Sequence, residues 1–150
     1  MTTLKQRTFA TALACMASLG TALPAHAQTQ TQTSAPRCAT VEVHNVRPQQ
    51  GFLMVAAFTD ADSYNKKPSA RMQVPAGDAI TTFQLCGLSG EVVALTLFQD
   101  LDSDGKMGQN LLGMPTEPWG ASGSPGLFGP QWESTKVALT SATIIVKMSL

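Results

Sequence analysis

Short β-favouring runs separated by turn residues constrain this chain more than any other feature. In residues 41–44 the valines alternate with polar side chains, which is the two-residue period of a half-buried strand. Gly51 then opens the run FLMVAAF, which is apolar at both parities and is typical of a central strand covered on both faces. From residue 38 onward no segment sustains the apolar spacing of an amphipathic helix. The pattern predicts an all-β fold.

Further runs complete the predicted strand set. They are a short edge strand at residues 72–74, strands at residues 80–85 and 91–100, and a closing hairpin formed by residues 136–139 and 143–148. Six or seven strands within about 110 residues, joined by short turns, predict an immunoglobulin-like or transthyretin-like β-sandwich of about seven strands with one long loop.

The first 27 residues predict a cleaved signal peptide. Lys5 and Arg7 precede an apolar run at residues 9–23, and Ala25-His26-Ala27 matches the small-x-small cleavage pattern. The run is too short and too rich in small residues for a membrane-spanning helix, which needs about 20 strongly apolar residues. We therefore expect an exported protein, periplasmic or secreted, with no transmembrane segment in the mature chain. The alternatives are a retained anchor and a lipoprotein modified at Cys15.

Composition divides the remainder into two parts. Residues 28–37 are polar and are expected to form a disordered spacer, and residues 38–150 are expected to form a single domain. Loss of Lys5 and Arg7 reduces the ten basic residues to eight, against ten acidic residues. This balance argues against nucleic acid as a partner, because nucleic acid requires a basic patch. A small molecule, a glycan or an envelope protein is the expected partner.

Two cysteines, Cys38 and Cys86, remain when Cys15 leaves with the signal peptide. In an oxidising compartment an even pair predicts a disulfide. Closing a loop of nearly fifty residues would stabilise the fold by about 4 kcal/mol. Two independent buried thiols are the alternative.

A segment rich in Gly, Pro and Ser at residues 100–135 is too long for an ordinary hairpin connection. Loops of this length are functional or are packed as a lid by their own apolar residues. We expect Trp119, Phe128 and Trp132 to anchor the segment to the sandwich. The alternative is that these aromatic side chains, Trp119 and Trp132 above all, contact a stacked ligand.

The segment begins with acids at alternate positions. Asp100, Asp102 and Asp104 occupy the first, third and fifth places of a calcium loop, Gly105 occupies the sixth, and the carbonyl of Lys106 would be the seventh-place ligand. Hard oxygen ligands without His or Cys favour calcium over transition metals.

The calcium pattern is incomplete further along the loop. The ninth and twelfth places are Gly108 and Leu111, which excludes an EF-hand, and we expect Asn110 or Glu117 to donate a further oxygen. The alternative is a solvated acidic turn whose side chains accept hydrogen bonds from nearby backbone N–H groups.

Candidate catalytic residues are scarce. His44 is the only histidine after residue 27, and it lies on the solvent-facing parity of its strand. No G-x-S-x-G nucleophile elbow occurs. We predict no catalytic residue and expect a binding or structural module. The alternative is a small carboxylate-dependent hydrolase or carbohydrate-active enzyme that uses the same loop.

The stretch from LSG at residues 88–90 through FQDLDSDGKMGQNLLGMPTEPWGASG to FGPQWESTKVAL resembles the bacterial family called domain of unknown function 2141. The resemblance spans about residues 40–150, and the segment GMPTEPWG is distinctive. The family's loop positions fall on Asp100, Asp102, Asp104, Gly105, Asn110, Gly113, Pro115, Glu117, Gly120 and Ser122. The sequence departs at Gly108, where the family often has an acid, and at Gln99, where a histidine often precedes the aspartate. The resemblance implies an exported, β-rich protein.

Overall fold

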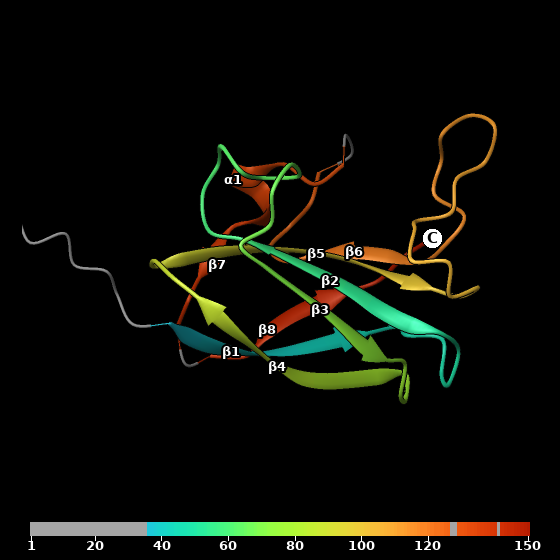
Figure 1. Cartoon of the computed structure of the whole chain (residues 1–150), viewed down its shortest axis with the longest axis horizontal. Coiled ribbons are helices and arrows are strands. Elements are labelled where there is room, and N and C mark those ends of the chain that lie inside the picture. Colours follow the sequence, from blue (N-terminus) through green and yellow to red (C-terminus); the bar gives the residue numbers. More distant parts are fainter. Residues whose placement is uncertain (1–35, 127–128, 141) are drawn as a thin grey trace, which may run out of the picture. The chain divides into compact units, whose positions relative to one another are not determined.

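The computed structural model describes residues 36–126, 129–140 and 142–150 (Figure 1). Within these residues the chain forms eight strands and one four-residue helix. The elements are β1 (Arg37–His44), β2 (Phe52–Phe58), β3 (Ala70–Pro75), β4 (Ile80–Leu88), β5 (Val92–Asp100), β6 (Trp119–Ala121), α1 (Trp132–Thr135), β7 (Val137–Ala138) and β8 (Ile144–Lys147). The predicted signal peptide with Cys15, residues 28–35 of the spacer, and Phe128 lie outside the described residues. No described helix has the length and hydropathy needed to cross a membrane.

The strands form two sheets. One has the order β4-β1-β8, and the other has the order β3-β2-β5-β6, with β7 pairing with β5. Paired strands are antiparallel except β1 and β8, which run parallel with Val41 opposite Ile144 and Val43 opposite Val146. The predicted all-β sandwich is confirmed, with eight strands in the described residues.

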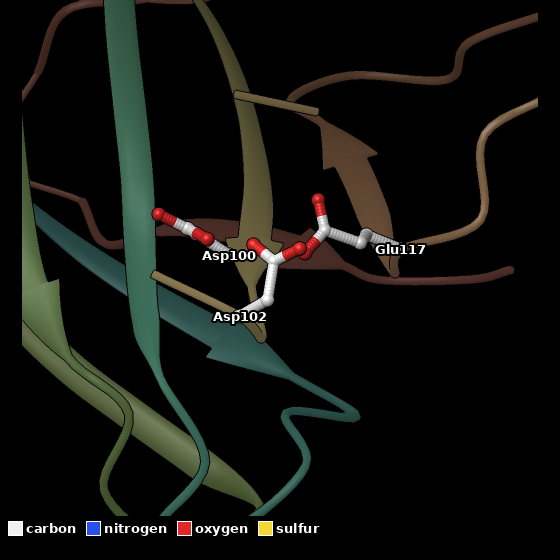
Figure 2. A group of neighbouring side chains, drawn as sticks. All are labelled: Asp100, Asp102 and Glu117. Carbon is white, nitrogen blue, oxygen red and sulfur yellow. The ribbon is translucent and has the colours of Figure 1, made fainter. Parts of the chain in front are cut away.

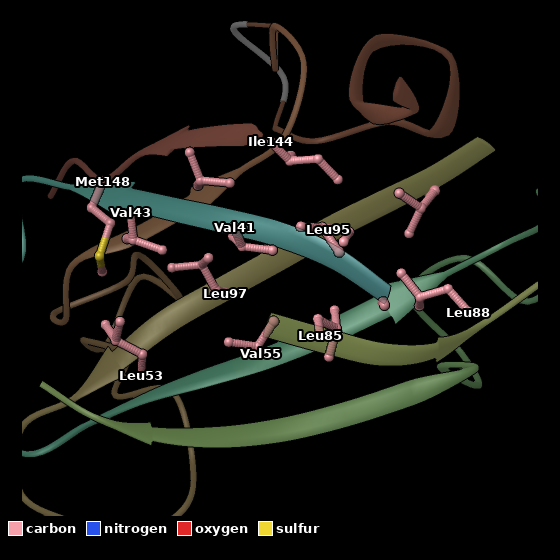
Figure 3. Close-up of a cluster of buried hydrophobic side chains, with 14 of the residues drawn as sticks. Val41, Val43, Leu53, Val55, Leu85, Leu88, Leu95, Leu97, Ile144 and Met148 are labelled. Carbon is pink, nitrogen blue, oxygen red and sulfur yellow. The ribbon is translucent and has the colours of Figure 1, made fainter. Parts of the chain in front are cut away.

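The core lies between the two sheets (Figure 3). Alternate residues of each strand point into it, as the two-residue period requires. The core includes Val41, Val43, Leu53, Val55, Leu85, Leu95, Leu97, Ile144 and Val146. The prediction that the FLMVAAF strand is covered on both faces is wrong over most of its length. In β2, Leu53, Val55 and Ala57 are buried, whereas Met54 and Ala56 on the outer face are only half-buried.

The predicted closing hairpin is also wrong. β7 pairs with β5, with Val92 opposite Ala138, whereas β8 pairs with β1 in the other sheet. The two runs bury apolar residues in the same core, since Leu139 and Ile144 both belong to it, but each run completes a different sheet. The predicted edge strand is confirmed, because β3 stands at the end of its sheet.

A disulfide joins Cys38 of β1 to Cys86 of β4, as predicted. Both cysteines are exposed, which excludes the alternative of two buried thiols. The bridge lies beside an irregularity in the pairing between Arg37 and Ala39.

A second, smaller cluster fixes α1 against the outside of the five-stranded sheet. The Tyr64 ring packs edge-on against Phe58 and Trp132, with centroid distances of 5.1 and 5.8 Å. The Tyr64 hydroxyl donates a hydrogen bond to Oγ1 of buried Thr135 at 3.1 Å. Trp132 thus anchors the end of the long segment, in agreement with the anchoring prediction.

Candidate functional site

The candidate site begins where β5 ends. Gln99, which is fully buried, donates hydrogen bonds to the carbonyls of Arg47 (2.8 Å) and Gln50 (2.7 Å) and accepts one from the Arg47 N–H (2.9 Å). The side chain therefore ties the β1–β2 connection to the end of β5, directly before the acidic loop of residues 100–117. No buried polar atom is left unpaired there.

The next residue, Asp100, has the opposite parity and is nearly fully buried. Its Oδ1 accepts a hydrogen bond from the Asp104 N–H at 3.2 Å, and its Oδ2 accepts one from the Gly105 N–H at 2.9 Å. Gly105 has a φ of 77°, in the left-handed region where glycine carries no steric penalty. The loop therefore wraps around the Asp100 carboxylate.

Two exposed aspartates continue the turn. Oδ1 of Asp102 accepts a hydrogen bond from the Asp104 N–H at 3.2 Å, and Oδ1 of Asp104 accepts one from the Lys106 N–H at 2.7 Å. These are the side-chain-to-backbone bonds that the acidic-turn alternative anticipates.

Glu117 closes the loop from its far end. The side chain is 6% exposed, and its Oε1 and Oε2 accept hydrogen bonds from the N–H groups of Leu101 (2.7 Å) and Gly108 (2.8 Å). A Cβ at Gly108 would lie 2.6 Å from Oγ1 of Thr116, so this loop fits glycine where the family often has an acid. Glu117 is therefore a buried clamp, a side chain that holds Leu101 and Gly108 against the far end of the loop.

Three carboxylates meet at this point. Asp100, Asp102 and Glu117 each place one oxygen within 4.8 Å of the others (Figure 2). The ion pairs among the described residues, His44–Glu42 and Lys136–Glu133, do not involve this group. Two full charges at this separation repel by about 3 kcal/mol at an effective dielectric constant near 20. Backbone N–H groups offset part of that cost.

The remaining predicted ligands have other visible partners. Asp104 is not part of the three-carboxylate group. Oδ1 of Asn110 accepts hydrogen bonds from the N–H groups of Leu112 (2.9 Å) and Met114 (3.0 Å), which shapes the tip of the loop. Metal ligation by Asp104, Asn110 and the Lys106 carbonyl stays a prediction.

Trp119 lies on β6 beside a groove of about 420 Å³ on the outer face of the five-stranded sheet. Met107 of the acidic loop also lines this groove, whereas Trp132 does not. The sequence reasoning missed the groove because it assumed that β2 is covered on both faces. The apolar outer-parity residues Met54 and Ala56 were the available signal.

The family motif includes Ser122, and the structure shows that its side chain links β5 to α1. Its Oγ accepts a hydrogen bond from the Leu95 N–H at 2.9 Å and donates one to the Thr135 carbonyl at 2.7 Å, and the residue is fully buried. Its position in the family motif therefore reflects a structural role, as does that of Gly120, where a Cβ would meet the Lys147 carbonyl oxygen at 2.8 Å.

Comparison with protein families matches residues 41–147 to the family described as "Uncharacterized protein conserved in bacteria (DUF2141)". The match covers more than half of the chain, so the chain belongs to this family. Comparisons with curated proteins and with solved structures found no match.

Proposed function

We propose that this member of the bacterial family is an exported binding module whose acidic loop is held in shape by a calcium ion. The single observation that carries the proposal is the meeting of Asp100, Asp102 and Glu117, two of them buried, with no cationic side chain paired to them in the described part of the chain. A divalent cation would turn the mutual repulsion of these carboxylates into attraction.

The donor chemistry favours calcium among the divalent ions. Calcium takes six to eight oxygen ligands and accepts irregular geometry, so three carboxylates can be supplemented by backbone carbonyls and water. Magnesium demands a near-ideal octahedron and gives up its water reluctantly. Calcium modules outside the cell work at a Kd of about 10⁻⁴ to 10⁻³ M, which an incomplete set of protein ligands can provide.

Bound calcium would order the acidic loop and would also affect the groove that the loop borders. The ion would link Asp100 at the end of β5 to Glu117 just before β6, and these two residues enclose the entire loop. Met107 inside the loop lines the groove on the sheet, so an ordered loop gives that groove a fixed wall. Export into an oxidising compartment is supported by the disulfide between Cys38 and Cys86 and is tested by cell fractionation.

The calcium proposal is tested by thermal unfolding of the protein purified after export in a bacterial host. A ligand present at about 10 to 100 times its Kd stabilises the folded state by about 1.4 to 2.7 kcal/mol. Ten millimolar calcium should therefore raise Tm by several degrees relative to EDTA, and magnesium at the same concentration should raise it less.

The matched variants are Asp102→Asn and Asp62→Asn, both at exposed aspartates. Asp102→Asn should abolish most of the calcium response, and in EDTA it should melt no lower than the native protein, because it removes one repelling charge. Asp62→Asn, outside the acidic loop, should keep the full response. Equal Tm values in calcium and in EDTA would overturn the proposal.

A further inference from the structure

The groove on the five-stranded sheet is built from two cross-strand rows on its outer face. The first row contains large apolar side chains, because Met54 lies opposite Phe98, and Phe98 lies opposite Trp119. The second row contains small ones, because Ala56 lies opposite Thr96. Directly opposite residues in antiparallel strands share a face and lie side by side. The second row therefore forms a low floor beside the wall that the first row makes.

The groove has the size and character of a small-molecule site. Its volume of about 420 Å³ lies within the range of roughly 300 to 1,000 Å³ that is typical of ligand pockets. The side chains of Met54, Phe98 and Trp119 are half-buried and so keep apolar surface free for a ligand. Methionine adapts its shape to a flexible partner, and Met107 adds a second one from the acidic loop.

Charge at the groove has one sign. Arg71 of β3 lies opposite Ala56, which places its side chain on the same face as the floor and at the edge of the sheet. Among the described residues that line the groove, Arg71 is the only charged one. Neither of the ion pairs within the described residues involves it. A guanidinium group presents a fork of N–H donors that matches a carboxylate.

We propose that this groove binds a small amphipathic carboxylate, with its head group on Arg71 and its alkyl body along Ala56 and Thr96, against Met54, Phe98 and Trp119. The charge selects an anion, and the apolar wall selects a ligand with a hydrocarbon body. The assignment goes beyond the calcium proposal and does not require it, because β2, β3, β5 and β6 supply the floor, the wall and the arginine.

Trp119 fluorescence can report ligand binding in the groove, because the chain has two tryptophans and only Trp119 lines the groove. In a Trp132→Phe background, which keeps an aromatic ring against Tyr64, an undecanoate brominated at its far end should quench Trp119 fluorescence in a saturable manner. The titration is run below the micelle concentration of the ligand, both in EDTA and in calcium. The alcohol and the trimethylammonium compound of the same brominated chain are the ligand controls.

The variant pair is Arg71→Gln and Arg47→Gln. Each substitution removes one positive charge from an exposed arginine, but Arg71 lines the groove and Arg47 does not. Arg71→Gln should weaken carboxylate binding about tenfold and leave alcohol binding unchanged, as expected for loss of one charge-assisted contact. Arg47→Gln should bind the carboxylate like its parent. If the Trp132→Phe background does not fold, calorimetric titration of the native chain with the same three ligands replaces the fluorescence measurement.

Three outcomes would overturn the proposal: no saturable binding of the carboxylate in either buffer, equal affinity for the carboxylate and the cationic ligand, or equal effects of the two arginine substitutions. A dimer in solution whose dissociation is needed to expose Trp119 would also overturn it, because a second copy would then occupy the groove. Carboxylate binding in EDTA without any calcium effect on Tm would support this site while rejecting the calcium proposal.

Discussion

At the scale of single residues, the acidic loop depends on one glycine that is distant from it in sequence. Gly51, immediately before β2, has a φ of 62°, and a Cβ there would lie 1.8 Å from the carbonyl oxygen of Asp100. The register pairs the next residue, Phe52, with Asp100 itself. Glycine is needed at residue 51 both for its backbone conformation and for the close approach of the two strands.

Two alanine substitutions separate these effects. Gly87 also has a positive φ, 82°, but a Cβ there would meet no atom within 4 Å. Gly87→Ala should therefore lower the free energy of unfolding by only about 1 to 2 kcal/mol, the cost of a left-handed residue with a side chain. Gly51→Ala should lower the free energy of unfolding clearly more, because the start of β2 and the end of β5 must also move apart. Urea unfolding measures both losses. Equal losses would show that the close approach to Asp100 carries no energetic weight.

At the scale of elements, the acidic loop is held at both ends by one side chain. Glu117 accepts hydrogen bonds from the N–H groups of Leu101 and Gly108, so it connects the beginning, the middle and the end of the loop. The Glu117 carboxylate is buried, so it acts within the loop rather than at the surface. A carboxylate suits the position because both of its oxygens are acceptors.

Glu117→Gln replaces one acceptor with an NH₂ donor that faces a backbone N–H. The variant should lose about 1 to 3 kcal/mol of unfolding free energy, the cost of leaving a buried donor unpaired. Chemical denaturation checks this, with Glu91→Gln at an exposed glutamate as the matched control. A hydrolase that uses Glu117 would instead lose turnover and keep its stability, so an unchanged unfolding midpoint would contradict the clamp.

Elements differed in how well the sequence predicted them, for a physical reason. β1 and β4 were recognised because one buried face imposes a two-residue period over most of their length. β5 was recognised as a long β-favouring apolar run, although it has consecutive buried residues. β6 and α1 contain three and four residues, too few to show a period, and both lie within the loop segment. The false hairpin arose because periodicity shows that β7 and β8 are strands and says nothing about which sheet each one joins.

The candidate site was predictable only where it is local in sequence. The alternation of acids indicated Asp100 and Asp102, and the incomplete ligand set together with the family motif indicated Glu117. The hydrogen bonds of Gln99 to the β1–β2 connection could not be anticipated, since they join residues about fifty positions apart. The groove was missed because β2 was expected to be covered on both faces, and its full lining becomes visible only once the register of four strands is known.

At the scale of the whole molecule, the disulfide cross-links the three-stranded sheet. Cys38 and Cys86 are 48 residues apart, and the loop between them contains all of β2 and β3, which belong to the opposite sheet. The bridge therefore restricts the unfolded chain across both layers of the sandwich.

Replacing both cysteines by serine should lower the free energy of unfolding by about 4 kcal/mol, the loop-closure entropy restored to the unfolded chain. Both side chains are exposed, so the serines should cost little in packing. Denaturation of the double variant, compared with the native protein before and after reduction, measures the effect. A double variant as stable as the oxidised protein would show that the bridge does not constrain the unfolded state.

The parallel pairing of β1 with β8 joins segments that are far apart in the sequence, since Val41 lies opposite Ile144. During synthesis, a chain that has not yet reached residues 144–147 cannot complete the three-stranded sheet. Until then the apolar face of β1 lacks Ile144 and Val146 as cover. The closed sandwich therefore depends on β8, and a truncation before residue 144 should leave the three-stranded sheet without one of its edges.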